Sequence, residues 1–264
     1  MEFRLWTHDL RARAERLLYV GHEKLDNLYL ATVQKCGSQW MSAIFNDPRM
    51  KAVTGLVRMP QRFYEYGQHV SRFPKGFFVP GLYVSYQTFE SFIEKPKNYR
   101  VIYIYRDPRD LVVSDYYSTL KTHATNAVVD TIRGRLMTMS KEEGLAYIMR
   151  YNDKFAYMRS WLELSVNDAN VMLVKFEDVT REPLDVFGRI MKHCGIVMDV
   201  DVLANILSDY DKDKMRQRDL AARSDRTESH YRFRASAHEE EFTDFHNKLF
   251  RDITGNLLEV LGYS

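Results

Sequence analysis

The stretch Thr32-Val-Gln-Lys-Cys-Gly-Ser-Gln-Trp-Met41 follows directly after the apolar run NLYLA. An apolar run with aromatic and aliphatic residues predicts a buried strand. A lysine, a glycine and small polar residues just after a strand are typical of a loop that wraps a phosphate, because backbone N–H groups and the start of a helix then face the anion. A plain turn that caps a helix is the alternative for this short stretch taken alone.

Two further runs resemble the first, and the sequence predicts buried strands at residues 28–33, 99–105 and 170–176. Apolar residues at three- and four-residue steps predict helices at residues 108–120, 141–164, 181–194 and 239–261. Alternation of strands and helices indicates an α/β fold of three layers, with a central, mostly parallel sheet and helices on both faces. In the absence of repeats or linkers, we expect residues 1–264 to form a single domain.

The composition is that of an ordinary globular protein, with 45% hydrophobic and 28% charged residues among 264. A formal net charge of +2 gives no field that would attract nucleic acid, so we expect no nucleic-acid partner. Cys36 and Cys194 lack metal-ligand spacing, and we expect neither a metal site nor a disulfide framework. Charges interrupt residues 1–20 too often for a signal peptide or a membrane span, so we expect a cytoplasmic protein.

A second polar segment, Arg106-Asp-Pro-Arg-Asp-Leu-Val-Val-Ser-Asp-Tyr-Tyr117, follows the second predicted strand. Ligands bind at the carboxyl ends of parallel strands, and Pro108 suits the first turn of a helix, so Arg106 is expected to face the crevice. Ser114 lies two helical turns beyond Arg106, and its hydroxyl reaches the same anion only if the helix runs beside that anion. The alternative is that Arg106 is an ordinary solvated arginine. Two such polar segments after two core strands favour a phosphate-bearing ligand.

The residue order excludes the P-loop of nucleotide triphosphatases, GxxxxGK followed by Ser or Thr, because Lys35 precedes the only glycine of its loop. The segments QKCGSQW and RDPRDLVVSDYY instead resemble the PKSGTTW-like and RNPRDxxxSxYY-like motifs of sulfotransferases that use 3′-phosphoadenosine 5′-phosphosulfate (PAPS). VMLVKFED and FRDITGNLLEVLGYS are similar to the LxxxYED and C-terminal LGY segments of the same cytosolic-type family. The resemblance covers most of the chain and implies a P-loop-like fold.

This resemblance implies transfer of a sulfuryl group from PAPS to a hydroxyl of a small or amphipathic acceptor, which leaves 3′-phosphoadenosine 5′-phosphate (PAP). Lys35 would contact the 5′-phosphosulfate and stabilise the leaving phosphate. The rest of the loop would bind the 5′-phosphate through residues Cys36, Gly37, Ser38 and Gln39.

The remaining family positions imply contacts with the adenosine half of the nucleotide. Trp40 would stack near the adenine, and Phe176 stands where the family usually has a tyrosine beside the base. Arg106 and Ser114 would hold the 3′-phosphate.

A family loop of the type RKGxxGDW, which also grips the 3′-phosphate, is replaced here by His230-Tyr-Arg-Phe-Arg-Ala-Ser236. Arg232 and Arg234 are therefore the candidate 3′-phosphate ligands of this segment, with solvated arginines as the alternative. Residues 211–236 are either an ordered lid or a mobile loop that closes over the cofactor.

The histidine that normally takes the acceptor's proton is missing from the segment before the RDPRD strand. Residues 76–86 read GFFVPGLYVSY, and Gly81 or a neighbour occupies the histidine's place. His69 is the nearest histidine and the predicted base, while Glu65 is the alternative. Because the usual base is absent, a sulfotransferase-like nucleotide-binding protein with weak or lost turnover is the second functional hypothesis.

Residues 63–92 are dense in aromatic side chains and show no clear period over their whole length. We interpret this region as a pocket-lining loop for a small or amphipathic acceptor, with filling of the core as the alternative. The sequence leaves the identity of the acceptor and the oligomeric state open.

Overall fold

The computed structural model describes residues 25–60, 64, 72–123, 126–222, 229 and 236–263. The chain divides into two compact units. The first unit comprises Met1–Tyr105 and Ser160–Tyr210, and the second comprises Arg106–Arg159 and Asp211–Ser264. A single domain over residues 1–264 stays a prediction.

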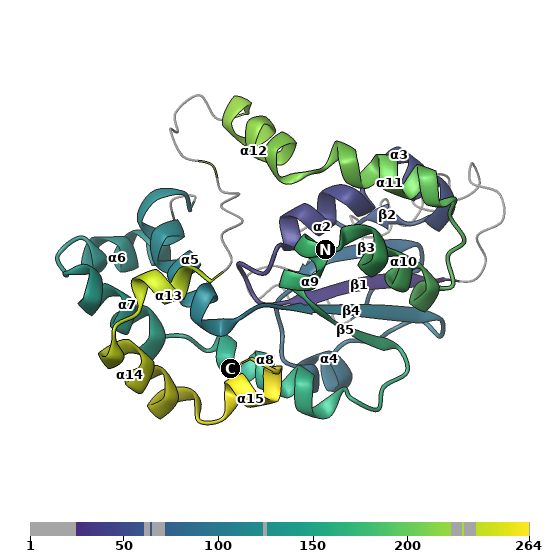
Figure 1. Cartoon of the computed structure of the whole chain (residues 1–264). Helices are drawn as coiled ribbons and strands as arrows, with labels where there is room; N and C mark the ends of the chain where they lie inside the picture. Colours follow the sequence, from purple (N-terminus) through teal and green to yellow (C-terminus); the bar gives the residue numbers. More distant parts are fainter. Residues whose placement is uncertain are drawn as a thin grey trace. The chain divides into compact units, whose positions relative to one another are not determined.

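The first unit contains a five-stranded sheet in the order β2-β3-β1-β4-β5, and every neighbouring pair is parallel (Figure 1). Its strands are β1 (Asn27–Thr32), β2 (Val57–Arg58), β3 (Phe77–Leu82), β4 (Tyr99–Tyr105) and β5 (Val171–Lys175). The predicted parallel α/β sheet is thus confirmed. Later strands lie on both sides of β1, so the strand order reverses there, which is where open parallel sheets form their ligand crevice.

Helices cover both faces of this sheet, as predicted (Figure 1). The helices of the first unit are α2 (Ser38–Phe45), α3 (Pro48–Thr54), α4 (Tyr86–Phe92), α9 (Phe176–Arg181), α10 (Pro183–Cys194) and α11 (Val200–Asp209). On the face of α2 and α10, the Phe45 ring packs against Phe78 and Phe187. On the face of α4, the Trp161 indole stacks on the Tyr103 ring at 4.8 Å between centroids. These apolar layers form the core of the unit.

Strand β3 was not predicted, and the interpretation of its residues as a pocket-lining loop was wrong. All six of its residues are buried, including Phe77 and Phe78. Two residues conceal the strand in the sequence: Pro80 cannot donate to a ladder, and Gly81 has a left-handed φ of 67° where the register with β1 shifts. A bulge of this kind interrupts the alternating pattern by which a strand is recognised.

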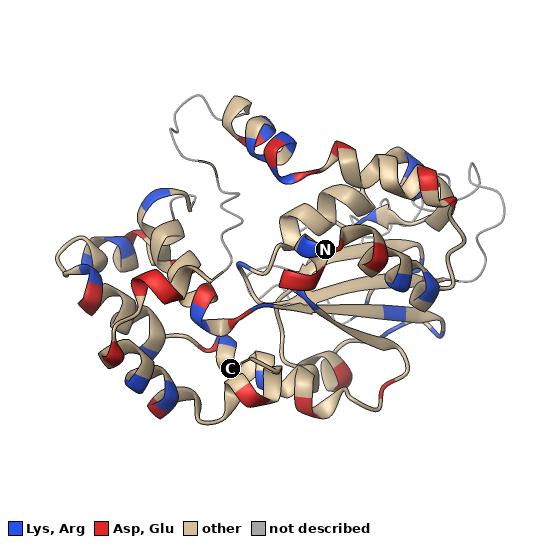
Figure 2. Cartoon of the chain, in the orientation of Figure 1, with Lys and Arg blue, Asp and Glu red and all other residues tan. Residues whose placement is uncertain are grey.

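The second unit is helical. Its helices are α5 (Pro108–Lys121), α6 (Ala127–Leu136), α7 (Lys141–Arg150), α12 (Lys212–Ala221), α13 (Ala237–Glu241), α14 (Asp244–Thr254) and α15 (Leu257–Leu261), and α8 (Lys154–Leu164) runs from this unit into the first. Lys and Arg are interspersed with Asp and Glu over both units (Figure 2). None of the helices in the described part of the chain has the length and apolar character needed to span a membrane.

Three predicted helices have different bounds in the structure. The one at 141–164 breaks before α8, where the Asn152 side chain accepts from the Lys154 backbone N–H, and the one at 239–261 breaks at Thr243 and at Gly255. The one at 181–194 begins at Pro183, after the separate helix α9. The Asn152 hydrogen bond starts α8, and the Thr243 backbone N–H donates to the His246 ring at the start of α14, so a helix can end and restart without a break in the apolar pattern.

Candidate active site

The loop after β1 turns sharply into α2. Lys35 and Gly37 both have left-handed backbones, with φ of 77° and 81°. Left-handed residues in such a turn direct successive backbone N–H groups inward, which forms an anion-binding concavity. No side chain caps the amino end of α2, whose N-cap is Gly37. An anion at this end would therefore satisfy N–H groups that the helix itself cannot pair.

Gly37 is held in place by the ring of Phe176. A Cβ at Gly37 would lie 2.5 Å from a ring carbon of Phe176, closer than side chains pack in proteins. Phe176 is buried and is the first residue of α9, directly after β5. The structure thus brings two predicted site residues, Gly37 and Phe176, into contact at the carboxyl ends of β1 and β5.

The loops after β1 and β3 are joined by a hydrogen bond between two hydroxyl groups. The Ser38 Oγ lies 3.0 Å from the Tyr83 Oη, just beyond the carboxyl end of β3. Gly81 makes this approach possible, because a Cβ there would lie 2.9 Å from the same phenol oxygen. Tyr83 was not predicted as a site residue. In the sequence it is one of many aromatic residues in this region, and it lies within residues 76–86, which lack the expected histidine.

The other residues of the loop differ in exposure. Cys36 is fully buried, Lys35 is half-buried, and Gln39 is exposed on the first turn of α2. The Lys35 cation, the backbone N–H groups and the Gln39 amide therefore all come from one short stretch of the chain.

Trp40 packs within the first unit. Its indole N–H donates to the carbonyl oxygen of Tyr210 at 2.6 Å, and its ring meets Phe187 edge to face. The side chain is only 4% exposed. This packing anchors α2 against α10, and the predicted stacking of Trp40 on an adenine stays a prediction.

In the second unit, Arg106 is part of a buried polar cluster around Asp110. The Arg106 Nη2 lies 3.3 Å from the Asp110 Oδ2, four residues further on at the start of α5. Asp110 also accepts hydrogen bonds from the backbone N–H groups of Ser236 (2.8 Å) and His238 (3.0 Å), and its Oδ1 lies 2.8 Å from the His238 Nδ1. One carboxylate thus ties Arg106 to a chain segment more than a hundred positions away.

The charge of this cluster follows from the pKa of Asp110. Burial raises the pKa of the carboxyl, but the hydrogen bond from His238 and the charge of Arg106 outweigh burial, and the pKa lies below its ordinary value. Asp110 is therefore ionised at neutral pH and attracts the guanidinium of Arg106. Ser114 is half-buried on the same helix, two turns beyond Arg106.

Four of the predicted residues, His69, Glu65, Arg232 and Arg234, lie outside the described residues, so their roles stay predictions. Within the proposed lid at 211–236, the structure describes helix α12 together with residues 211, 222, 229 and 236. Among the described residues, no group of three or more His, Cys, Asp or Glu side chains is arranged to hold a metal ion.

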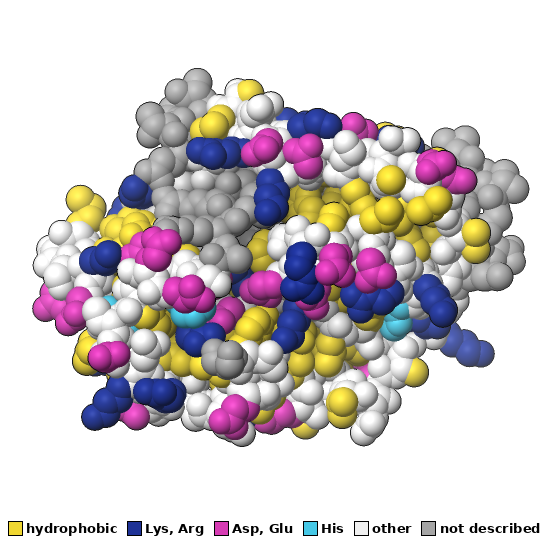
Figure 3. All heavy atoms as spheres, in the orientation of Figure 1, with side chains coloured by type: hydrophobic (Ala, Val, Ile, Leu, Met, Phe, Trp, Pro, Cys, Tyr) yellow, Lys and Arg dark blue, Asp and Glu magenta, His cyan; other side chains and the backbone are white. Residues whose placement is uncertain are grey.

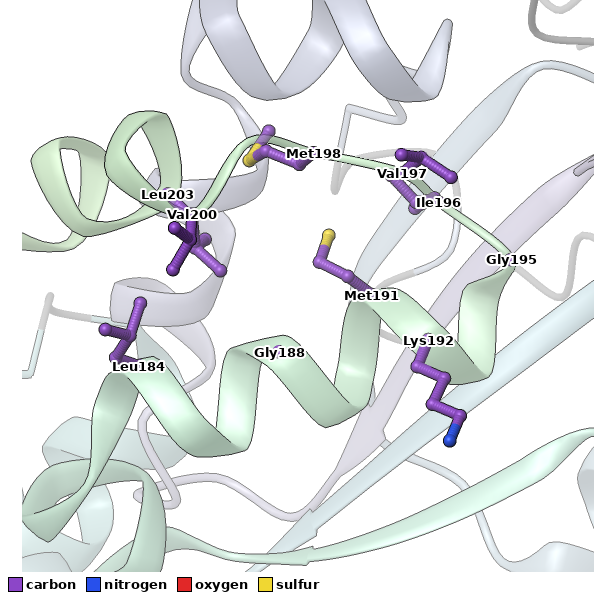
Figure 4. Close-up of a pocket in the computed structure, with 10 residues that line it drawn as sticks. All are labelled: Leu184, Gly188, Met191, Lys192, Gly195, Ile196, Val197, Met198, Val200 and Leu203. Carbon is purple, nitrogen blue, oxygen red and sulfur yellow. The ribbon is translucent and has the colours of Figure 1, made fainter.

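An open apolar cavity of about 460 Å³ lies between α10 and α11. Leu184, Met191, Val200 and Leu203 line it together with the loop between the helices (Figure 4), and hydrophobic side chains are exposed along this part of the surface (Figure 3). Among the described residues that line it, Lys192 is the only charged one. Small-molecule sites combine an apolar wall with several converging polar groups, so we do not include this cavity in the candidate site.

Replacement of Gly37 by Ala should destabilise the protein more than the same change at Gly195. Both glycines have a left-handed φ, so each variant loses about 1–2 kcal/mol of backbone energy. Only Gly37→Ala also displaces the Phe176 ring, at about 1–3 kcal/mol, because nothing lies within 4 Å of a Cβ at Gly195. Urea unfolding of both variants measures the difference, and equal losses would show that the ring does not confine Gly37.

Replacement of Asp110 by Asn should lower the free energy of unfolding by about 1–3 kcal/mol near neutral pH, since buried donors lose their charged acceptor. The folded pKa of Asp110 is depressed, so its contribution is present above the ordinary aspartate range and is lost as pH falls through the folded pKa. The difference between wild type and Asp110→Asn should therefore shrink below about pH 4. Urea unfolding over pH tests this, with Asp185→Asn, from an exposed ion pair, as the control. A constant difference would contradict the assignment.

The sulfotransferase domain family matches residues 80–262 of the chain. Sulfotransferase 2A6 of Rattus norvegicus is 28% identical over 193 residues, which cover 70% of this chain and 64% of the rat protein. The 3-alpha-hydroxysteroid sulfotransferase of Cavia porcellus is 24% identical over 184 residues, which cover 65% of this chain and 60% of that enzyme. The matched region therefore spans less than two thirds of either relative.

Solved structures show the same fold. Mouse sulfotransferase SULT7A1 complexed with PAP superposes with a TM-score of 0.62 at 19% identity, over 94% of this chain and 89% of the mouse chain. Retinol dehydratase in complex with androsterone and inactive cofactor PAP gives a TM-score of 0.58 at 15% identity, over 95% and 85% of the two chains. Because the family match covers more than half of the sequence, the chain belongs to the sulfotransferase domain family.

Proposed function

We propose that this protein transfers a sulfuryl group from PAPS to a hydroxyl of a small or amphipathic acceptor in the cytoplasm. The observation that carries the proposal is the left-handed turn at Lys35 and Gly37, which leads into a helix end without a side-chain cap. Family membership supports the reaction type. The names of the hydroxysteroid sulfotransferase relative and of the androsterone complex support a small, largely apolar alcohol as the acceptor.

The residues of the loop fit the 5′-phosphate of such a nucleotide. The N–H groups of the turn and the amino end of α2 supply hydrogen bonds, and Lys35 supplies a point charge. Gly37 carries no side chain, and a Cβ there would meet the Phe176 ring. When bound, PAPS supplies the activated sulfuryl group.

The 3′-phosphate requires a second cation. Arg106 follows β4 directly, and Asp110 fixes its guanidinium, so little side-chain entropy is lost when it binds an anion. Ser114 on the same helix would add a hydroxyl. Arg232 and Arg234 are proposed as further ligands of the same phosphate.

Catalysis is assigned mainly to Lys35. Sulfuryl transfer, like phosphoryl transfer, requires positioning of the reactants and stabilisation of the charge that develops on the leaving oxygen. His69, with Glu65 as the alternative, is the base that the sequence predicts, and this role stays a prediction. The second candidate is a protein that binds the nucleotide with weak or lost turnover. The absence of a histidine from residues 76–86 favours this candidate, whereas the presence of Lys35 disfavours it.

The wild-type protein should bind PAP more tightly than adenosine 5′-monophosphate. A charge-assisted hydrogen bond to the 3′-phosphate contributes roughly 1.5–3 kcal/mol, which corresponds to about a tenfold to hundredfold difference in Kd. Calorimetric titration should show this preference erased in Arg106→Ala and kept in Arg109→Ala, whose side chain pairs with Asp107 instead. Equal affinity of the wild type for both nucleotides would overturn the cofactor assignment.

Replacement of Lys35 by Ala should lower turnover on the order of 10²-fold and weaken PAP binding only modestly, because the lysine acts on charge that develops in the transition state. Both residues carry a Cβ, so the left-handed backbone at this position is equally strained in the two proteins. Steady-state assays and calorimetry measure the two effects, with the exposed Lys192→Ala as the control. If the wild-type protein binds the nucleotide but turns over no hydroxysteroid and no phenol, the second candidate is favoured.

A further inference from the structure

The Tyr83 hydroxyl lies close to the place where the sequence lacks a histidine. Tyr83 comes directly after β3, and its Oη lies 3.0 Å from the Oγ of Ser38, the first residue of α2. Ser38 is one of the proposed ligands of the 5′-phosphate. The phenol is therefore one hydrogen bond away from the group that leaves in the proposed reaction.

The backbone around Tyr83 holds the phenol in this position. Strand β3 is fixed between β1 and β2, and the Pro80 carbonyl accepts a hydrogen bond from the Tyr64 hydroxyl. Gly81 has no side chain at the point where the Tyr83 oxygen crosses it, and its left-handed φ coincides with the shift in register between β3 and β1. The phenol is half-buried, whereas Ser38 is only 6% exposed. The pair thus extends from a partly open surface to the anion-binding turn.

We propose that Tyr83 and Ser38 relay the acceptor's proton to the leaving 5′-phosphate. This proposal rests on the proposed function. As the acceptor oxygen forms its bond to sulfur, Tyr83 Oη accepts the acceptor's proton and passes its own proton to Ser38 Oγ. Ser38 in turn gives its proton to the phosphate oxygen, which keeps the electron pair of the broken S–O bond. Both hydroxyl groups end the step neutral, and the proton ends on the phosphate.

A relay suits a phenol better than the role of a free base. The ordinary pKa of tyrosine is near 10, so the side chain is protonated at neutral pH and cannot accept a proton unless it gives one away at the same time. Ser38 provides the outlet, and the leaving oxygen becomes more basic as the sulfuryl group departs. A protein with this relay has no need of a histidine at the end of β3.

Tyr86 provides a matched comparison within the same segment. Its hydroxyl donates to the Asp168 carboxylate at 3.2 Å and not to the loop. Burial and the nearby Asp168 charge raise the pKa of Tyr86. The Tyr86→Phe variant therefore loses a tyrosine hydroxyl in the same region and leaves the proposed relay intact.

The test compares Tyr83→Phe with Tyr86→Phe. Tyr83→Phe should lower kcat on the order of 10²-fold, as loss of proton transfer commonly does, while calorimetry should find its Kd for PAP within about threefold of wild type. Tyr86→Phe should keep wild-type kcat. Because the relay uses no histidine, His69→Ala should keep the wild-type kcat.

Three results would overturn the relay. The first is wild-type turnover by Tyr83→Phe, and the second is a loss of PAP affinity as large as the loss of kcat, which would make Tyr83 an anchor for Ser38. The third is a wild-type rate that rises through about pH 6–7 and is abolished in His69→Ala, which would identify a histidine base. Failure of the wild type to prefer PAP over adenosine 5′-monophosphate would overturn the proposed function instead, so the two failures are distinguishable.

Discussion

Backbone N–H groups cannot converge on an anion unless the chain turns sharply, and in this protein a ring packed against a glycine holds the turn. The Phe176 ring occupies the space in which a side chain at Gly37 would lie, and Gly37 adopts a left-handed φ that other residues rarely accept. Because Phe176 directly follows β5 while Gly37 follows β1, the contact links two loops at the carboxyl edge of the sheet. The parallel sheet thus determines the shape of the anion site before any charge is considered.

Much of this arrangement was predictable because it is local in sequence. The end of β1, Gly37 and the start of α2 lie within a few residues of one another, and so do the end of β4, Arg106 and Pro108. Apolar runs and turn residues are sufficient to locate such units. Strand β3 was missed for a physical reason, since Pro80 and Gly81 are the residues least typical of a strand interior and occur there only because of the bulge.

The contacts that support the functional side chains were not predictable from the same patterns. Asp110 was read only as part of a motif, yet it binds Arg106, Ser236 and His238 through its two oxygens. The hydrogen bond between Ser38 and Tyr83 likewise joins residues far apart in the chain. Periodicity carries no information about which distant polar groups meet, because such pairs depend on the packing of whole elements.

The proposed chemistry depends on how the protein moves a proton when residues 76–86 supply no histidine. An alcohol acceptor has a pKa far above neutrality, so its proton must move as the bond to sulfur forms, and a carboxylate or imidazole is only one way to receive it. The leaving phosphate is itself a base that appears at the right moment, and two hydroxyl groups in series can deliver the proton to it. Gly81, at the bulge, leaves room for the Tyr83 phenol that contacts Ser38. The same glycine that hides β3 in the sequence therefore leaves room for the contact on which this route depends.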